Sequence, residues 1–118
     1  NDEEIVDYYH ALDLYIISSR EEGGPKGIVE SMASGVPLVS TNVGMASDFL
    51  VDNINGALVQ SFEPEEIAKK SIKILSNQSK DNLIKQARSD VMKADWKVVA
   101  DMHWEKVYLP ALKELSEK

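Results

Sequence analysis

The sequence predicts an α/β domain whose core is a parallel sheet of about three short strands, with helices on both faces of the sheet. Segments with a helical spacing of apolar residues alternate along the chain with short apolar runs. This alternation is typical of parallel strands joined by right-handed helical crossovers. The run 14–17 is apolar throughout, which indicates a strand covered on both faces.

Length and composition limit what this domain can be. Its 118 residues, 43% of them hydrophobic, suffice for one core and leave no room for a second domain. The net charge of −7 makes nucleic acid an unfavourable partner. The chain has no cysteine, and its two histidines, His10 and His103, are far apart in sequence. We therefore expect no disulfide, no metal and no cofactor.

Hydropathy and the amino-terminal residues bear on location. The longest uncharged stretch, 31–47, is interrupted by glycine and proline and is too short to span a bilayer. The first four residues are acidic rather than basic, unlike the start of a signal peptide. We expect a cytoplasmic protein, and peripheral attachment to the inner membrane face is compatible with the sequence.

The first half of the chain is expected to alternate helix and strand. Apolar residues at helical spacing predict a helix over 2–12. After the strand at 14–17, three glycines and a proline within 18–27 predict a loop. A short helix over 27–34 should end at Gly35, because glycine readily takes the left-handed conformation after a helix.

The second half continues the pattern and closes with helices. The expected elements are a strand over 37–40, a loop over 41–44, one or two helical turns over 46–51, a turn over 52–56, a strand over 57–59, and helices over 64–75, 80–93 and 97–115. Pro64 suits the first turn of its helix, whereas Pro110 is expected to bend or divide the last one. Trp104 and Tyr108, four residues apart, are expected to form part of a core packing stripe.

Two loops of this arrangement are candidates for a functional site. Parallel sheets bind ligands at the carboxyl ends of their strands, where the loops 18–27 and 41–44 should lie. The first loop is rich in glycine and leads into a helix, whose free N–H groups suit a phosphate. Lys26 adds a positive charge there. A plain turn into a helix accounts for the same residues.

Two glutamates flank this glycine-rich segment. Glu22 precedes the glycines and Glu30 lies eight residues later, inside the new helix. A carboxylate can accept two hydrogen bonds side by side, which matches the vicinal hydroxyls of a sugar or ribose. The simpler alternatives are a solvated surface charge for Glu22 and a favourable helix-terminus charge for Glu30.

The segment 22–39, EGGPKGIVESMASGVPLV, resembles the E-x7-E signature of retaining GT-B glycosyltransferases of family 4. Three further segments are similar to that family in the expected order. The segment 41–44 resembles its glycine loop, 55–59 its "nGllv" strand, and 95–108 its aromatic helix near the carboxyl end. The resemblance covers nearly the whole chain.

The resemblance implies a Rossmann-like fold and a single, incomplete nucleotide-sugar-binding domain over 1–118. It implies transfer of a sugar from a nucleotide-sugar donor to a glycan, lipid or other acceptor with retention, without an obligatory metal. Glu22 would be the catalytic residue that meets the donor sugar, and Glu30 would bind the ribose hydroxyls. Backbone amides around Lys26, Gly27 and Ile28 would bind the pyrophosphate. The other donor-binding residues implied are Gly23, Gly24, Pro25 and Gly44.

The sequence also departs from the family pattern. Gly24 and Pro25 stand where many members have an aromatic residue and a glycine, and Ser47 and Asp48 replace a Pro-Glu pair. For Asp48 we expect a helix-capping role.

The acceptor domain and the first strands of a donor domain have no counterpart in the 118 residues. We therefore expect a partner in the amino-terminal domain of the same enzyme, and no activity from the chain alone. We also expect self-association through an exposed sheet edge. The alternative function is a non-catalytic nucleotide- or phosphate-binding α/β module.

Overall fold

The computed structural model describes residues 1–24 and 26–116. Three strands, β1 (Tyr15–Ile17), β2 (Leu38–Thr41) and β3 (Ala57–Val59), form a parallel sheet in the order β1-β2-β3. The register places Tyr15 opposite Leu38 and Val39 opposite Ala57. The predicted three-stranded parallel sheet is confirmed.

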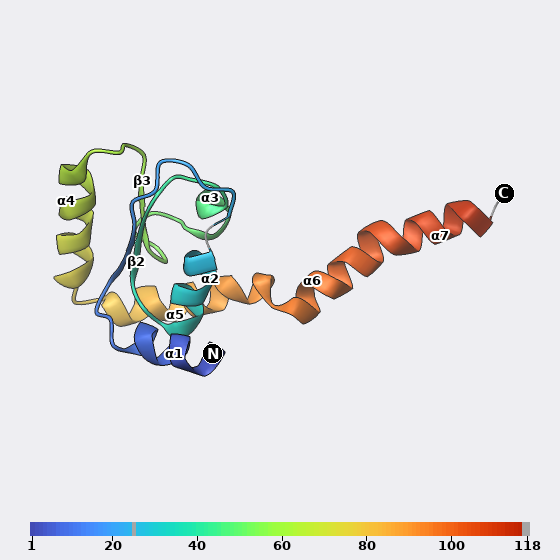
Figure 1. Ribbon diagram of the computed structural model, residues 1–118, viewed down its shortest axis with the longest axis horizontal. Helices are drawn as coiled ribbons and strands as arrows, with labels where there is room; N and C mark the ends of the chain where they lie inside the picture. Colours follow the sequence, from blue (N-terminus) through green and yellow to red (C-terminus); the bar gives the residue numbers. More distant parts are fainter. Residues whose placement is uncertain (25, 117–118) are drawn as a thin grey trace.

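The first helices lie around this sheet, and the last ones project away from it (Figure 1). In chain order they are α1 (Asp2–His10), α2 (Lys26–Ser34), α3 (Ala46–Phe49), α4 (Pro64–Leu75), α5 (Lys80–Val91), the 3-10 turn η1 (Met92–Ala94), α6 (Trp96–His103), the π-helical segment η2 (Trp104–Tyr108) and α7 (Leu109–Ser116).

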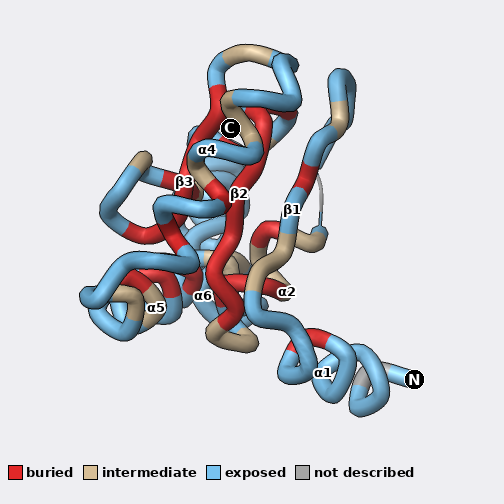
Figure 2. Tube along the Cα trace, turned by 90° about the vertical axis from the view of Figure 1, so that its left-hand side faces the viewer, coloured by how far each residue is buried: buried red, intermediate tan, exposed pale blue. Residues whose placement is uncertain are grey.

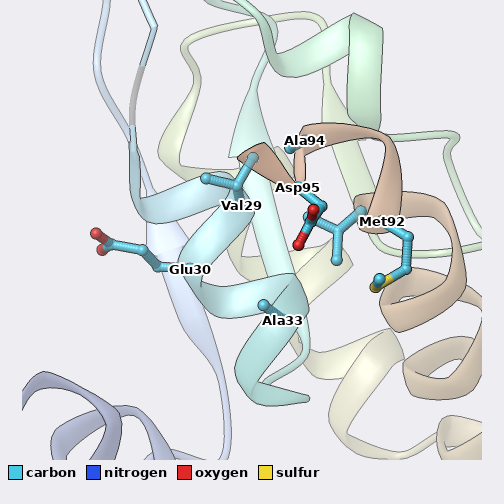
Figure 3. Close-up of a pocket in the computed structure, with 7 residues that line it drawn as sticks. Val29, Glu30, Ala33, Met92, Ala94 and Asp95 are labelled. Atoms are coloured by element: carbon cyan, nitrogen blue, oxygen red, sulfur yellow. The ribbon is translucent and has the colours of Figure 1, made fainter. Parts of the chain in front are cut away.

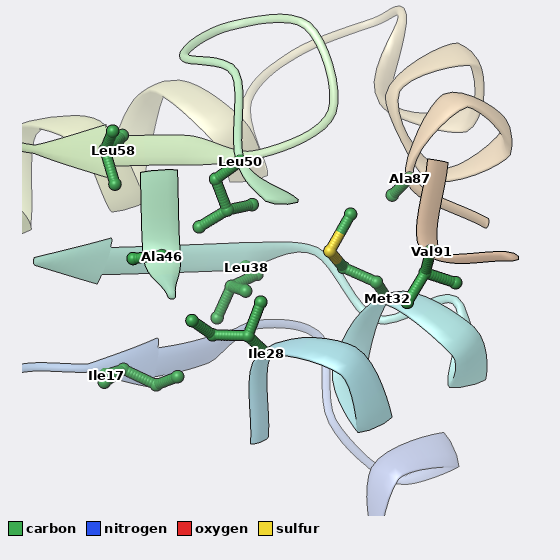
Figure 4. Packing of buried hydrophobic residues seen from close by; sticks show 9 residues of the cluster. All are labelled: Ile17, Ile28, Met32, Leu38, Ala46, Leu50, Leu58, Ala87 and Val91. Carbon is green, nitrogen blue, oxygen red and sulfur yellow. The ribbon is translucent and has the colours of Figure 1, made fainter. Parts of the chain in front are cut away.

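Helices cover both faces of the sheet, as expected for a three-layer α/β fold. Alternate strand residues point to opposite faces, so β2 and β3 contribute to two cores, one on each face of the sheet. The larger core lies under α2, α3 and α5 and contains Ile17, Ile28, Met32, Leu38, Ala46, Leu50, Leu58, Ala87 and Val91 (Figure 4). The smaller core lies under α4 and contains Val39, Ala57, Val59 and Ile74. The strand β2 is buried along its whole length, between its two neighbours (Figure 2).

The strand β1 lies at one edge of the sheet. Its central residue, Ile16, points away from the larger core and is 45% exposed. Unpaired strand edges can pair with another chain. Self-association through this edge stays a prediction.

The start of α1 and the end of α2 are set by residues that favour helix ends. A capping box closes the start of α1, since the Asn1 side chain accepts a hydrogen bond from the Glu4 N–H at 3.0 Å. Beyond α2, Gly35 takes the expected left-handed conformation, with φ +77°. Arg88 of α5 donates to the carbonyls of Ala33 and Ser34 at 3.3 and 3.4 Å. This contact fixes the carboxyl end of α2 against α5.

The capping role expected for Asp48 is wrong. The helix α3 begins at Ala46, its N-cap position is Met45, and no side chain caps it. Asp48 therefore lies two residues inside the helix, where its carboxylate acts on the helix only through its charge. The helix is also shorter than the expected 46–51, because Leu50 has an extended conformation.

The last helical segment runs from α6 through η2 into α7 and projects from the body of the molecule (Figure 1). It makes the molecule 60 Å long against 31 and 28 Å in the other directions. Pro110 does not divide this segment, since it lies within α7, which directly follows the five-residue π-helical segment η2. Proline lacks the N–H group for one backbone hydrogen bond, and π-helical turns occur where the regular hydrogen bonding of a helix is interrupted.

The core position expected for Trp104 and Tyr108 is wrong within this chain. The two side chains are 54% and 58% exposed, and their ring centroids lie 6.3 Å apart. Helical spacing correctly places them on one face. However, that face projects away from the sheet, so nothing in the described residues covers it.

A half-buried ion pair joins the turn before β3 to α4. The Asp52 carboxylate accepts hydrogen bonds from Lys70 Nζ at 2.6 Å and from the Leu58 N–H at 3.0 Å. Burial opposes ionisation of Asp52, but these two hydrogen bonds and the lysine charge outweigh it and hold the pKa of this carboxyl below its usual value.

We expect Asp52→Asn to lower the free energy of unfolding by about 0.5–1 kcal/mol at neutral pH, since the pair is partly exposed to solvent. A lowered folded-state pKa stabilises the fold above the unfolded-state pKa, and this stabilisation is lost as the pH falls through the folded-state value. Urea unfolding at pH 7 and at about pH 3 should therefore show a smaller difference from wild type in acid. Asp13→Asn, at an exposed position, is the control. An equal difference at both pH values would contradict the role of the charge.

Candidate functional site

The loops that follow β1 and β2 lie against each other at the carboxyl edge of the sheet. Gly44 has φ +51°, and a Cβ atom there would lie 2.7 Å from the Glu22 carbonyl oxygen and 2.9 Å from the Gly23 carbonyl carbon. Thr41, buried at the end of β2, donates its hydroxyl hydrogen to the Ser19 carbonyl at 2.6 Å. These contacts bring Gly44 directly onto the backbone of the glycine-rich loop.

A pocket of about 290 Å³ lies where this loop leads into α2. Glu22, Lys26 and Gly27 from the predicted site line it, together with Tyr15 and residues 16–19. The Glu22 and Lys26 side chains are exposed. The structure thus brings a carboxylate, an ammonium group and the start of a helix to one pocket.

The other predicted site residues around this pocket differ in their surroundings. Gly23 has open space where a side chain would be, and a Cβ at Gly24 would lie 3.2 Å from Met45 Cε. Pro25 lies outside the described residues. Ile28 is fully buried in the larger core, so only its backbone amide is available to a ligand.

The start of α2 is suited to an anion. The N–H groups of the first turn of a helix have no partner within the helix and carry a partial positive charge. The first turn of α2 contains no acidic residue that would neutralise this charge. At Gly27 a Cβ would lie 2.8 Å from the Tyr15 ring, so the first turn packs closely on β1.

Glu30 does not line this pocket. It lies one turn further into α2, so the helix-terminus explanation for its charge is wrong. Its side chain borders two other hollows, one of about 240 Å³ beside α1 and one of about 280 Å³ beside η1. Figure 3 shows the carboxylate pointing away from Met92 and Asp95. The Tyr9 hydroxyl donates a hydrogen bond to Glu30 Oε2 at 2.9 Å.

Two tyrosines connect Glu30 with the pocket, and sequence reasoning missed both as site residues. Tyr15 lines the pocket, and its ring meets the Tyr9 ring edge-on at a centroid distance of 5.4 Å and an angle of 70°. The helical spacing of Tyr9 marks it as facing inward. Nothing in the sequence shows that its hydroxyl meets a glutamate 21 positions away.

The structure can also be searched for metal sites and for helices long enough to span a membrane. Within 1–24 and 26–116, the structure brings no three His, Asp or Glu side chains into an arrangement that could hold a metal ion. Across the same described ranges, every helix is too short or too polar to pass through a bilayer.

Three parallel strands between layers of helices define a Rossmann-like α/β domain, a class in which ligands bind beside the loops at the carboxyl ends of the strands. Comparison with protein families makes the assignment more specific. The model of the family "Glycosyl transferases group 1" matches residues 1–90, and the chain belongs to this family.

Individual relatives agree with the family. An uncharacterized glycosyltransferase of Methanocaldococcus jannaschii is 26% identical over 64% of this chain and 22% of its own length. Sucrose-phosphate synthase from Thermosynechococcus elongatus has the same fold, with a TM-score of 0.80 and 23% identity over 97% of this chain and 29% of that one. HepE from Anabaena, solved with UDP-glucose, has a TM-score of 0.70 and 25% identity over 76% of this chain and 25% of its own. The chain therefore spans about a quarter of the length of these proteins.

Proposed function

We propose that the chain forms part of the nucleotide-sugar site of a retaining glycosyltransferase of the family 4, E-x7-E type. The observation that carries the proposal is the pocket shared by Glu22, Lys26 and Gly27 at the carboxyl edge of the sheet. Membership of the glycosyltransferase family and the UDP-glucose bound by HepE support it. Because the relatives are about four times as long, the acceptor site and the remaining donor contacts belong to another part of a longer protein. The 118 residues alone are inactive in this proposal.

The diphosphate of the donor binds at the start of α2. Three free amides, at Lys26, Gly27 and Ile28, and the Lys26 ammonium supply local positive potential. This potential counteracts the net charge of −7. A diphosphate in this position has its leaving oxygen close to the pocket that Glu22 lines.

Glu22 acts on the sugar. Positive charge develops at the anomeric carbon as its bond to the diphosphate oxygen breaks and the electron pair leaves with the diphosphate. A carboxylate beside that carbon stabilises the charge and accepts hydrogen bonds from the sugar hydroxyls. The acceptor oxygen then bonds to the same face of the sugar, and its proton passes to the departing diphosphate. The configuration is retained because the new bond forms on the face from which the diphosphate departs.

Glu30 binds the ribose, and this role gives the test of the proposal. We expect Glu30→Gln to weaken UDP and UDP-glucose alike by about tenfold, because a charge-assisted hydrogen bond is lost in both complexes. Calorimetry on the full natural chain that carries residues 1–118 measures both affinities, with GDP and ADP and their sugar forms tested in parallel.

Glu105→Gln, at an exposed position on the projecting helix, is the matched control and should bind as wild type. Unchanged affinity of Glu30→Gln for every nucleotide would disprove the ribose role. Nucleotide binding without transfer to any acceptor would favour the non-catalytic module instead.

A further inference from the structure

The contact between Tyr9 and Glu30 joins α1 to the proposed nucleotide site. Tyr9 is only 8% exposed, and its hydroxyl donates to Glu30 Oε2 at 2.9 Å. A carboxylate has two oxygen atoms that accept hydrogen bonds. In the part of the chain that the structure describes, no donor is recorded for the second oxygen, Oε1. One oxygen of Glu30 is therefore held by the protein while the other is available to a ligand.

Tyr9 is itself held in place. Its ring packs edge-on against Tyr15, and Tyr15 packs against the backbone of Gly27, where a Cβ would lie 2.8 Å from the Tyr15 hydroxyl. Burial, followed by the hydrogen bond to Glu30 and the neighbouring Tyr15, raises the pKa of Tyr9 well above its usual value. The Tyr9 hydroxyl thus keeps its proton and remains a donor across the physiological pH range.

We infer that Tyr9 is a positioning residue that orients the Glu30 carboxylate toward the ribose hydroxyls of the donor nucleotide. The inference rests on the proposed function, because it needs Glu30 to bind the nucleotide. A glutamate side chain has several rotatable bonds, and fixing one of its oxygens before binding reduces the ordering that the ligand would otherwise impose. Because Tyr9 packs on Tyr15, and Tyr15 packs on Gly27, the position of the Glu30 carboxylate is also fixed relative to the start of α2 beside the diphosphate pocket.

The test is Tyr9→Phe in the full natural chain, since phenylalanine keeps the ring packed on Tyr15 and removes only the hydroxyl. UDP is the probe, or GDP or ADP if either binds wild type more tightly. We expect the Kd to rise about three- to tenfold. The KM for the matching nucleotide sugar should rise by a similar factor while kcat stays within about twofold, the pattern of a lost ground-state contact.

A double-mutant cycle separates positioning from general packing. In a Glu30→Ala background, Tyr9→Phe should have no further effect on the Kd. Tyr8→Phe, at the adjacent position where the side chain is 75% exposed, is the control and should bind as wild type. Ultraviolet titration of the tyrosines should show a lower pKa for Tyr9 in Glu30→Ala, because the hydrogen bond that raises it is gone.

Two results would overturn the inference alone. One is an unchanged Kd in Tyr9→Phe when Glu30→Ala does weaken the nucleotide. The other is an equal loss of affinity from Tyr9→Phe in both backgrounds, which would show that Tyr9 acts without Glu30. If Glu30→Ala binds every nucleotide as wild type does, the ribose role itself is disproved, and the inference falls with it.

Discussion

Replacing Glu22 by glutamine is expected to lower kcat for sugar transfer by about 100-fold or more, the usual effect of removing one group that stabilises transition-state charge. Glu22 lines the pocket at the start of α2 together with Lys26, where the proposed reaction develops positive charge on the sugar. The affinity of the Glu22→Gln variant for UDP should stay within about twofold of the wild-type value, because an interaction made mainly in the transition state does not contribute to ground-state binding. Transfer kinetics with the preferred nucleotide sugar, paired with calorimetry on UDP, measure the two quantities.

Glu21→Gln is the matched control, since Glu21 is the adjacent exposed acid and does not line the pocket. It should keep both kcat and nucleotide affinity. If Glu22→Gln and Glu30→Gln weaken UDP equally with turnover preserved, the two glutamates do not have separate roles. If neither variant changes anything, neither glutamate takes part in donor binding or transfer, and the contact of Glu30 with Tyr9 is only structural.

The second large effect is expected at Gly44. Gly44→Ala should lower the free energy of unfolding by about 2–4 kcal/mol, the sum of a left-handed conformation forced on alanine and a Cβ pressed into neighbouring atoms. Those atoms are the Glu22 carbonyl oxygen and the Gly23 carbonyl carbon, at 2.7 and 2.9 Å. Because they are backbone atoms, the whole loop must move, and Glu22 moves with it. Urea unfolding measures the first effect, and the loss of kcat measures the second.

Gly23→Ala provides the comparison for stability. Gly23 belongs to the same loop, but no atom lies within 4 Å of an added Cβ. Its change in unfolding free energy should therefore stay within about 0.5 kcal/mol. A Gly44→Ala variant as stable as Gly23→Ala would show that the two loops do not touch in solution.

The sheet could be predicted from the sequence because each strand is a short apolar run bounded by turn residues. The runs 14–17, 37–40 and 57–59 each contain the observed strand to within a residue. Parallel pairing then follows from the helices between them, and it places both loops at one edge of the sheet. The end of α2 at Gly35 could also be predicted, since few other residues take the left-handed conformation easily.

The features that sequence reasoning missed depend on contacts between distant residues. Asn55 reads as a turn residue, yet it is buried and donates to the Phe49 carbonyl and to Asp90 of α5. The hydrogen bond from Tyr9 to Glu30 is of the same kind. Along the last helix, periodicity shows which residues share a face, but whether that face is covered depends on where the chain leaves the body.

The projecting helix also determines what the tryptophan fluorescence of these 118 residues reports. The chain has two tryptophans, Trp96 and Trp104, and both lie on that helix, 85% and 54% exposed. The α/β body contains no tryptophan, so indole fluorescence does not follow the unfolding of the sheet. It is instead a built-in local probe, because any surface that covers the helix shifts the emission to shorter wavelengths.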